Sequence, residues 1–64
     1  MTEEEIIKAV GQVEGLEGMT VNERLFVSGL MKEFDKAQKA DKAKARKILE
    51  LLKVDNPSIE KIVN

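Results

Sequence analysis

Apolar residues recur every three or four positions along most of this chain, which is the spacing of an amphipathic helix rather than the alternation of a strand. The pattern is clearest over residues 20–39, where Thr20 and Glu23 have the spacing of a capping box at a helix start. We therefore predict a helix over this range. Its expected core face consists of six residues: Phe26, Val27, Leu30, Met31, Phe34 and Ala37.

The first half of this predicted helix is apolar on two sides, because Val21, Leu25 and Gly29 interrupt its polar face. We expect different elements, or a second chain, to cover both sides. Glycine is unfavourable inside a helix by about 1 kcal/mol relative to alanine. We interpret Gly29 as a position where another helix packs closely against the backbone.

A second helix is predicted over residues 3–14, ahead of the first in the chain. Thr2 is followed three residues later by Glu5, which again gives a capping box. Ile6, Ile7, Val10 and Val13 share one face of this helix. The natural stop is Gly15, since glycine adopts a positive φ without a Cβ clash.

The second half of the chain predicts two more helices. One spans residues 42–53, with an apolar face formed by Ala45, Ile48, Leu49 and Leu52. A short last helix spans residues 57–63, because Asn56 can cap it and Pro57 suits a first turn. Together these patterns predict an all-α fold: a small bundle of three helices plus a short C-terminal helix, in a single domain over residues 1–64.

Residues 37–45 allow two interpretations, since they contain neither glycine nor proline. Helix propensity alone extends one helix from Thr20 to Lys53, and such a rod must dimerise to bury its apolar face. A continued helix places Asp41 on that face, and aspartate is a good N-cap. We therefore favour a turn near Lys39 to Asp41, because a hairpin lets two apolar faces bury each other.

Composition argues against several classes of function. The chain has no cysteine and no histidine, so Ser-His and Cys-His nucleophile pairs and thiolate or imidazole metal ligands are excluded. No glycine-rich phosphate loop is present. We predict a protein that is not an enzyme and that has no catalytic, cofactor-binding or metal-binding residue. No apolar run is long enough to span a membrane, and cytoplasmic localisation is the expectation.

Charge is unevenly distributed, although the net charge is only −1. Residues 1–23 hold six acids and one base, whereas residues 36–53 hold seven bases and two acids. We expect the two halves to complement each other within the fold or across a dimer. The alternative is nonspecific association with nucleic acid through the lysine-rich segment 36–47. Its candidate phosphate contacts are Lys36, Lys39, Lys42, Lys44, Arg46 and Lys47.

The favoured function is that of a protein–protein interaction module or small regulator, whose partner is another protein or a second copy of the chain. We expect the predicted bundle to leave one apolar surface uncovered, around Val21 and Leu25. Arg24 and Asp35 lie on the polar side of the same helix and complete the candidate partner surface. The other interpretation of Arg24 is structural, as part of a capping and ion-pair arrangement that fixes a helix junction.

One stretch resembles a family. Asn22 to Phe26, followed by Gly29-Leu30 and by Glu33 to Ala37, fits the pattern N-E-R-L-[F/Y]-x-x-G-L-x-x-E-F-D-x-A. The pattern is similar to that of a group of small uncharacterised bacterial proteins, in which a charged turn and a leucine-rich helix follow. The resemblance covers about Val21 to Leu52 and implies no activity, because none is established for the group. The segment Met1 to Gly18 departs from it.

Overall fold

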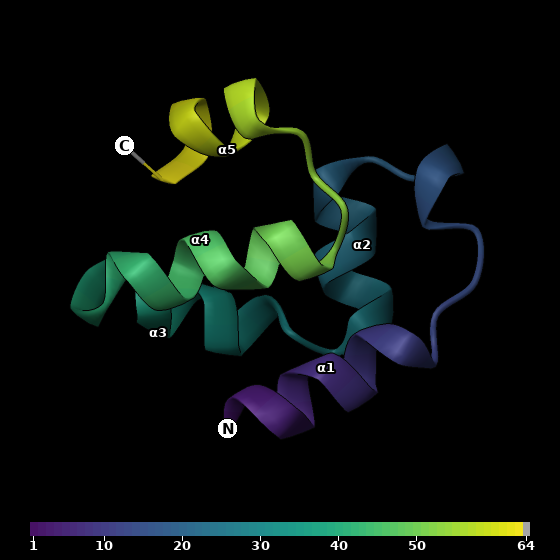
Figure 1. Cartoon of the computed structure of the whole chain (residues 1–64), viewed down its shortest axis with the longest axis horizontal. Coiled ribbons are helices and arrows are strands. Elements are labelled where there is room, and N and C mark those ends of the chain that lie inside the picture. Colours follow the sequence, from purple (N-terminus) through teal and green to yellow (C-terminus); the bar gives the residue numbers. More distant parts are fainter. Residues whose placement is uncertain (64) are drawn as a thin grey trace.

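The computed structural model describes residues 1–63, and every regular element in this part is helical. The elements in chain order are α1 (Glu3–Gly11), the 3₁₀ turn η1 (Leu16–Gly18), α2 (Val21–Ser28), α3 (Met31–Ala40), α4 (Lys42–Leu51) and α5 (Asn56–Val63). Figure 1 shows α3 and α4 side by side, with α1 below them, α5 above and α2 across one end. The predicted all-α class is confirmed, but the predicted number of helices is wrong.

The predicted helix over residues 20–39 is two helices, and Gly29 separates them. Gly29 has φ +76°, which L side chains rarely adopt. The N–H of Leu30 donates to the carbonyl of Leu25 (3.0 Å) and the N–H of Gly29 to that of Phe26 (3.1 Å), which is the Schellman arrangement of a helix end. The expected close packing at Gly29 is also wrong, since nothing lies within 4 Å of a Cβ built there.

The start of α1 agrees with its prediction, whereas its end does not. Thr2 and Glu5 form the capping box, with the Glu5 carboxylate accepting from the Thr2 N–H at 2.8 Å. The helix ends at Gly11 instead of continuing to residue 14. Gly15 does take the expected positive φ, of 76°, but as the residue before η1. The chain thus has an irregular connection between α1 and η1.

The turn between α3 and α4 lies where the sequence predicts it. Asp41 is the only residue between the two helices within the described chain, and its carboxylate accepts from the Lys44 N–H at 3.2 Å. This N-cap allows the two helices to fold back on each other as a hairpin. The continuous helix from Thr20 to Lys53 is therefore excluded.

The end of α4 repeats the Schellman arrangement without a glycine. Lys53 has φ +64°, and the Val54 N–H donates to the Leu49 carbonyl at 3.0 Å. The capping side chain of α5 is Asp55 rather than the expected Asn56, because the Asp55 carboxylate accepts from the Ser58 N–H at 3.2 Å. The helix accordingly begins at Asn56, one residue before its predicted start.

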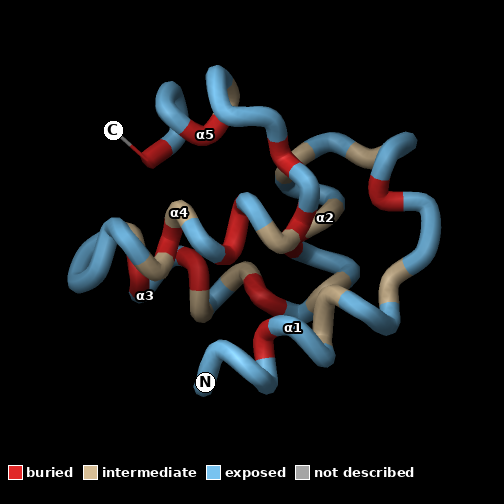
Figure 2. Tube along the Cα trace, in the orientation of Figure 1, coloured by how far each residue is buried: buried red, intermediate tan, exposed pale blue. Residues whose placement is uncertain are grey.

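A single core cluster joins all five α-helices and η1 of the described chain. Its centre is α4, whose Ile48 and Leu49 are fully enclosed. Figure 2 shows the buried positions on the facing sides of α3, α4 and α5. Burying each aliphatic side chain contributes about 1.5–3 kcal/mol. The core consists of Ile6, Leu16, Leu25, Leu30, Phe34, Ala37, Ala45, Ile48, Leu49, Leu52, Val54, Ile59 and Val63.

Three residues assigned to core faces by their helical periodicity are about half exposed or more. Phe26 is 75% exposed and Val27 is 49% exposed, whereas the neighbouring Leu25 is only 2% exposed. The break at Gly29 explains why Leu25 is buried in place of Phe26, because a separate α2 need not continue the apolar face of α3. Ile7, predicted on the buried side of α1, is likewise half exposed. The outward side of α2 therefore carries an aromatic side chain exposed to solvent.

Candidate apolar docking groove on α2

The orientation of α2 is set by its first turn and by Arg24. Thr20 and Glu23 form the predicted capping box, in which the Glu23 carboxylate accepts from the Thr20 N–H at 2.9 Å. The Arg24 guanidinium donates to the carbonyls of Met19 (3.1 Å), Leu52 (3.2 Å) and Lys53 (3.0 Å). One arginine thus joins the start of α2 to the end of α4, where the helix carbonyls lack intrahelical donors.

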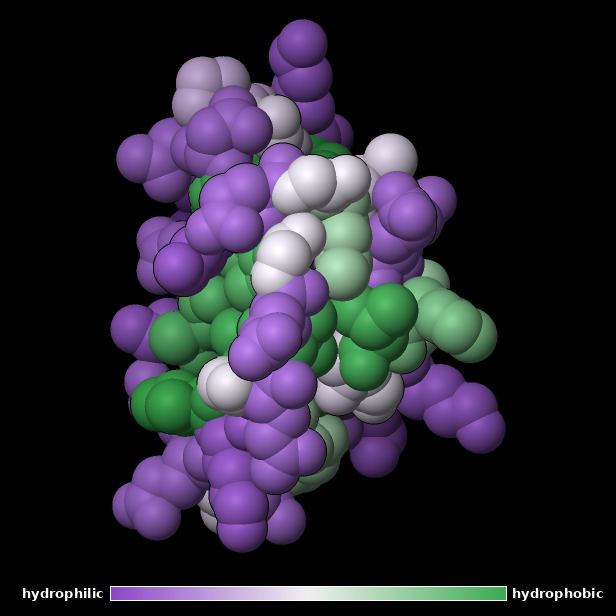
Figure 3. Space-filling model, turned by 90° about the vertical axis from the view of Figure 1, so that its right-hand side faces the viewer, coloured by the Kyte–Doolittle hydropathy of each residue, from purple (hydrophilic) through white to green (hydrophobic). Residues whose placement is uncertain are grey.

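This orientation turns Leu25 into the core and Phe26 into solvent. Phe26 and Val27 lie beside a groove of about 560 Å³, which also borders Asn22 and Glu23. Two half-buried methionines complete its lining, Met19 and Met31. Figure 3 faces the side of the molecule that carries η1 and α2, and shows hydrophobic groups exposed across its middle between hydrophilic groups above and below. We call these six residues the α2 groove.

The predicted partner surface is not a single exposed surface. Leu25 is a core residue, and Val21 is half buried and packs against the core. Arg24 is held by three carbonyls rather than by an ion pair, which favours its structural interpretation. Asp35 is exposed on α3. The exposed apolar surface on this helix is therefore offset by one residue from the prediction, to Phe26.

The Glu23 carboxyl group has a pKa below its ordinary value of 4.5, chiefly because its ionised form accepts the hydrogen bond from the Thr20 N–H. Glu23 is therefore an anion at neutral pH at the edge of the α2 groove. Three other carboxyl groups have a lowered pKa because a hydrogen bond favours the ionised form: Glu5 with Thr2, Glu33 with Lys44 and Asp55 with Ser58.

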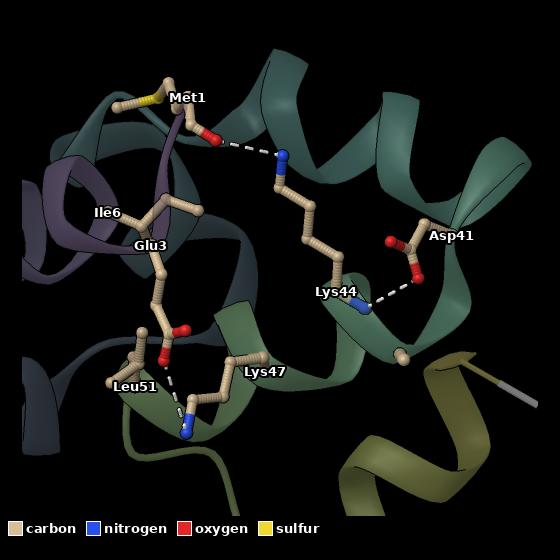
Figure 4. Close-up of a pocket in the computed structure, with 8 residues that line it drawn as sticks. Met1, Glu3, Ile6, Asp41, Lys44, Lys47 and Leu51 are labelled. Atoms are coloured by element: carbon tan, nitrogen blue, oxygen red, sulfur yellow. Dashed lines mark hydrogen bonds and ion pairs between the residues drawn. The ribbon is translucent and has the colours of Figure 1, made fainter.

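A second hollow, of about 430 Å³, lies between the start of α1 and α4. Lys44 is bound to the Glu33 carboxylate (2.6 Å) and the Met1 carbonyl (3.1 Å), and Lys47 pairs with Glu3 at 3.7 Å. Figure 4 shows the Lys47 and Glu3 side chains pointing toward each other and the Lys44 ammonium pointing toward Met1. These polar groups join α1 and the α3–α4 hairpin, which favours a structural role for this hollow.

The other predicted phosphate contacts are also partly engaged. The Lys42 ammonium donates to the Val63 carbonyl at the end of α5 (3.0 Å), and Arg46 pairs with Glu60 at 2.9 Å. Within residues 1–63, two of the six predicted contacts make no such side-chain bond, namely Lys36 and Lys39. Carboxylates of the fold therefore pair with three of the six basic residues and a carbonyl binds a fourth, and nucleic-acid association stays a prediction.

Two other properties of the described residues bear on the site. No helix among residues 1–63 is long and apolar enough to cross a membrane. In the same part of the chain, no three acidic side chains lie close enough together to hold a metal ion.

No family model, curated protein or solved structure matches this chain. The resemblance of the Asn22 to Ala37 stretch to a group of small bacterial proteins therefore stays a prediction. The structure does give its motif residues physical roles. Arg24 joins two helix ends, Leu25 and Leu30 are core residues, and Gly29 ends α2.

Proposed function

We propose that this chain is a small protein-interaction module, which acts by binding an apolar segment of a partner protein in the α2 groove. The observation that carries the proposal is the 75% exposure of Phe26 beside a groove bordered by methionine and valine. The domain gains little stability from an aromatic side chain left in water. A partner that covers Phe26 and Val27 removes that apolar surface from water, at roughly 25 cal/mol per Å².

The composition of the α2 groove also suits protein binding. Aromatic side chains are frequent anchors at the centre of interfaces. Methionine is flexible and polarizable, so Met19 and Met31 can adapt to the shape of a partner side chain. The groove is also well supported, because Leu25 and the Arg24 contacts fix α2 on the rest of the domain.

Peptide display tests the proposal without knowledge of the partner. A random peptide library is selected against the full chain, and the affinities of enriched peptides are measured for the wild type and for Phe26→Ser. We expect enriched peptides to lose at least tenfold in affinity for Phe26→Ser. The matched control is Ile7→Ser, which removes another exposed apolar side chain, outside the α2 groove.

Circular dichroism of both variants establishes that each remains folded, as expected for exposed positions. The proposal is wrong if no peptide is enriched, or if Ile7→Ser weakens binding as much as Phe26→Ser does.

A further inference from the structure

We infer that the segment bound by the α2 groove is a short amphipathic helix that carries lysine or arginine beside its apolar face. This inference rests on the proposed function and adds the chemistry of the partner. It follows from three properties of the groove: its charge, its backbone and its size.

The charge of the groove edge is negative. Among the described residues that line the groove, Glu23 is the charged one. The segment of residues 9–23, which leads into α2, contains three carboxylates and no lysine or arginine. The nearest cation in the sequence, Arg24, is bound to three carbonyls. Of the three carboxylates, Glu17 is paired with Lys53 at 3.9 Å, whereas Glu23 makes no ion pair within residues 1–63. A basic side chain on the partner can therefore pair with Glu23, whereas an acidic one is repelled.

The backbone beside the groove favours a helical partner. Phe26 and Val27 belong to α2, and the amides of the next residues are bound within the helix end, such as the Gly29 N–H to the Phe26 carbonyl. An extended peptide finds no sheet edge here to satisfy its own N–H and C=O groups. A helix satisfies them internally and presents only side chains to a groove.

The size of the groove favours a short segment over a second copy of the chain. Stable protein–protein interfaces of standard size use about 20–30 residues a side, and the α2 groove is lined by six. A two-fold dimer through this groove also places the Glu23 carboxylates of both copies at the same interface, where their repulsion opposes association.

Two synthetic probes test the inference on the full-length chain. Both are fluorescein-labelled 18-residue peptides with leucine on one helical face, and the other positions are lysine in one peptide and glutamate in the other. Fluorescence anisotropy at moderate salt gives their dissociation constants. We expect the lysine peptide to bind at least tenfold more tightly than the glutamate peptide, and Phe26→Ser to weaken it at least tenfold.

The contribution of the carboxylate is tested with Glu23→Gln, because glutamine also completes a capping box. We expect this change to weaken the lysine peptide about threefold. The matched control is Glu5→Gln, which removes the same charge from the corresponding capping position of α1 and should leave the affinity unchanged.

The outcomes separate this inference from the proposed function. Equal binding of both peptides, or equal effects of Glu23→Gln and Glu5→Gln, overturns the basic partner and leaves the groove as a docking site. Failure of both peptides, while displayed peptides still depend on Phe26, overturns the amphipathic helix. Sedimentation that shows a dimer abolished by Phe26→Ser overturns the inference by making a second copy the occupant. The proposed function itself fails if display enriches no peptide, or if Phe26→Ser weakens no bound peptide more than Ile7→Ser does.

Discussion

Replacing Arg24 should destabilise the fold far more than its half-exposed position suggests. Its guanidinium makes three charge-assisted hydrogen bonds to carbonyls, at 3.0–3.2 Å. Such bonds contribute about 1.5–3 kcal/mol each when buried, and partial exposure here reduces this to about 1 kcal/mol or less each. We therefore expect Arg24→Met, which keeps much of the aliphatic stem, to lower the free energy of unfolding by about 2 kcal/mol.

A loss of that size is large for a domain whose core supplies roughly 3–5 kcal/mol of net stability. It corresponds to a decrease in melting temperature of about 10 °C. Urea unfolding is followed by circular dichroism at 222 nm, because the chain has no tryptophan or tyrosine for fluorescence. Arg24→Lys should recover less than half of the loss, since a single ammonium group cannot reproduce the planar fork.

The chain provides its own control in its other arginine, Arg46, which forms a surface pair with Glu60. Arg46→Met should change the free energy of unfolding by no more than about 0.5–1 kcal/mol. The reasoning is refuted if Arg24→Met lowers the free energy of unfolding by less than about 0.5 kcal/mol, which is the range of exposed ion pairs. It is also refuted if Arg24→Met lowers it no more than Arg46→Met does. In either case the carbonyl contacts contribute nothing to stability.

Three further predictions concern the helix ends, the carboxyl groups with a lowered pKa and the side of α2 that faces the core. Lys53→Gly should stabilise the domain by about 0.5–1 kcal/mol and Gly29→Ala should destabilise it by about 1 kcal/mol, because both positions have a positive φ. Urea unfolding should show changes in the free energy of unfolding of opposite sign for the two variants, and changes of the same sign contradict the prediction. The four carboxyl groups with a lowered pKa bind fewer protons in the folded state than in the unfolded state. Their stabilising contribution is therefore complete above about pH 4.5 and is lost as the pH falls through their folded pKa values. Urea midpoints should decrease from pH 6 to pH 2, and Glu23→Gln should make that decrease with pH less steep. Leu25→Ala should cost about 2–5 kcal/mol and Phe26→Ala less than about 1 kcal/mol, and a reversal of this order means that α2 faces the other way.

Local patterns in the sequence predicted the helix starts well, because a cap and its partner lie only three residues apart. The capping boxes at Thr2 and Thr20 and the turn at Asp41 are all present. The inward face of α4 was also predictable, since Ile48 and Leu49 follow the helical repeat without interruption.

The errors concern one glycine and one long-range contact. Gly29 permits both a close helix packing and a positive φ, and the sequence pattern was interpreted as the former. A break at Gly29 separates the periodicity of α2 from that of α3, and Leu25 rather than Phe26 then faces inward. The partners of Arg24 at Leu52 and Lys53 lie 28 and 29 residues away, so no local pattern could reveal them.

We propose that partners bind on the Phe26 side of α2, and methionine methyl NMR can locate that binding. The chain has three methionines, of which Met19 and Met31 line the α2 groove while Met1 lies at the other hollow. A ¹³C-methyl-methionine sample is titrated with a peptide enriched by display. We predict saturable shifts of the Met19 and Met31 methyl signals and an unchanged Met1 signal. Shifts confined to Met1, or unchanged signals from all three despite measured binding, contradict the claim.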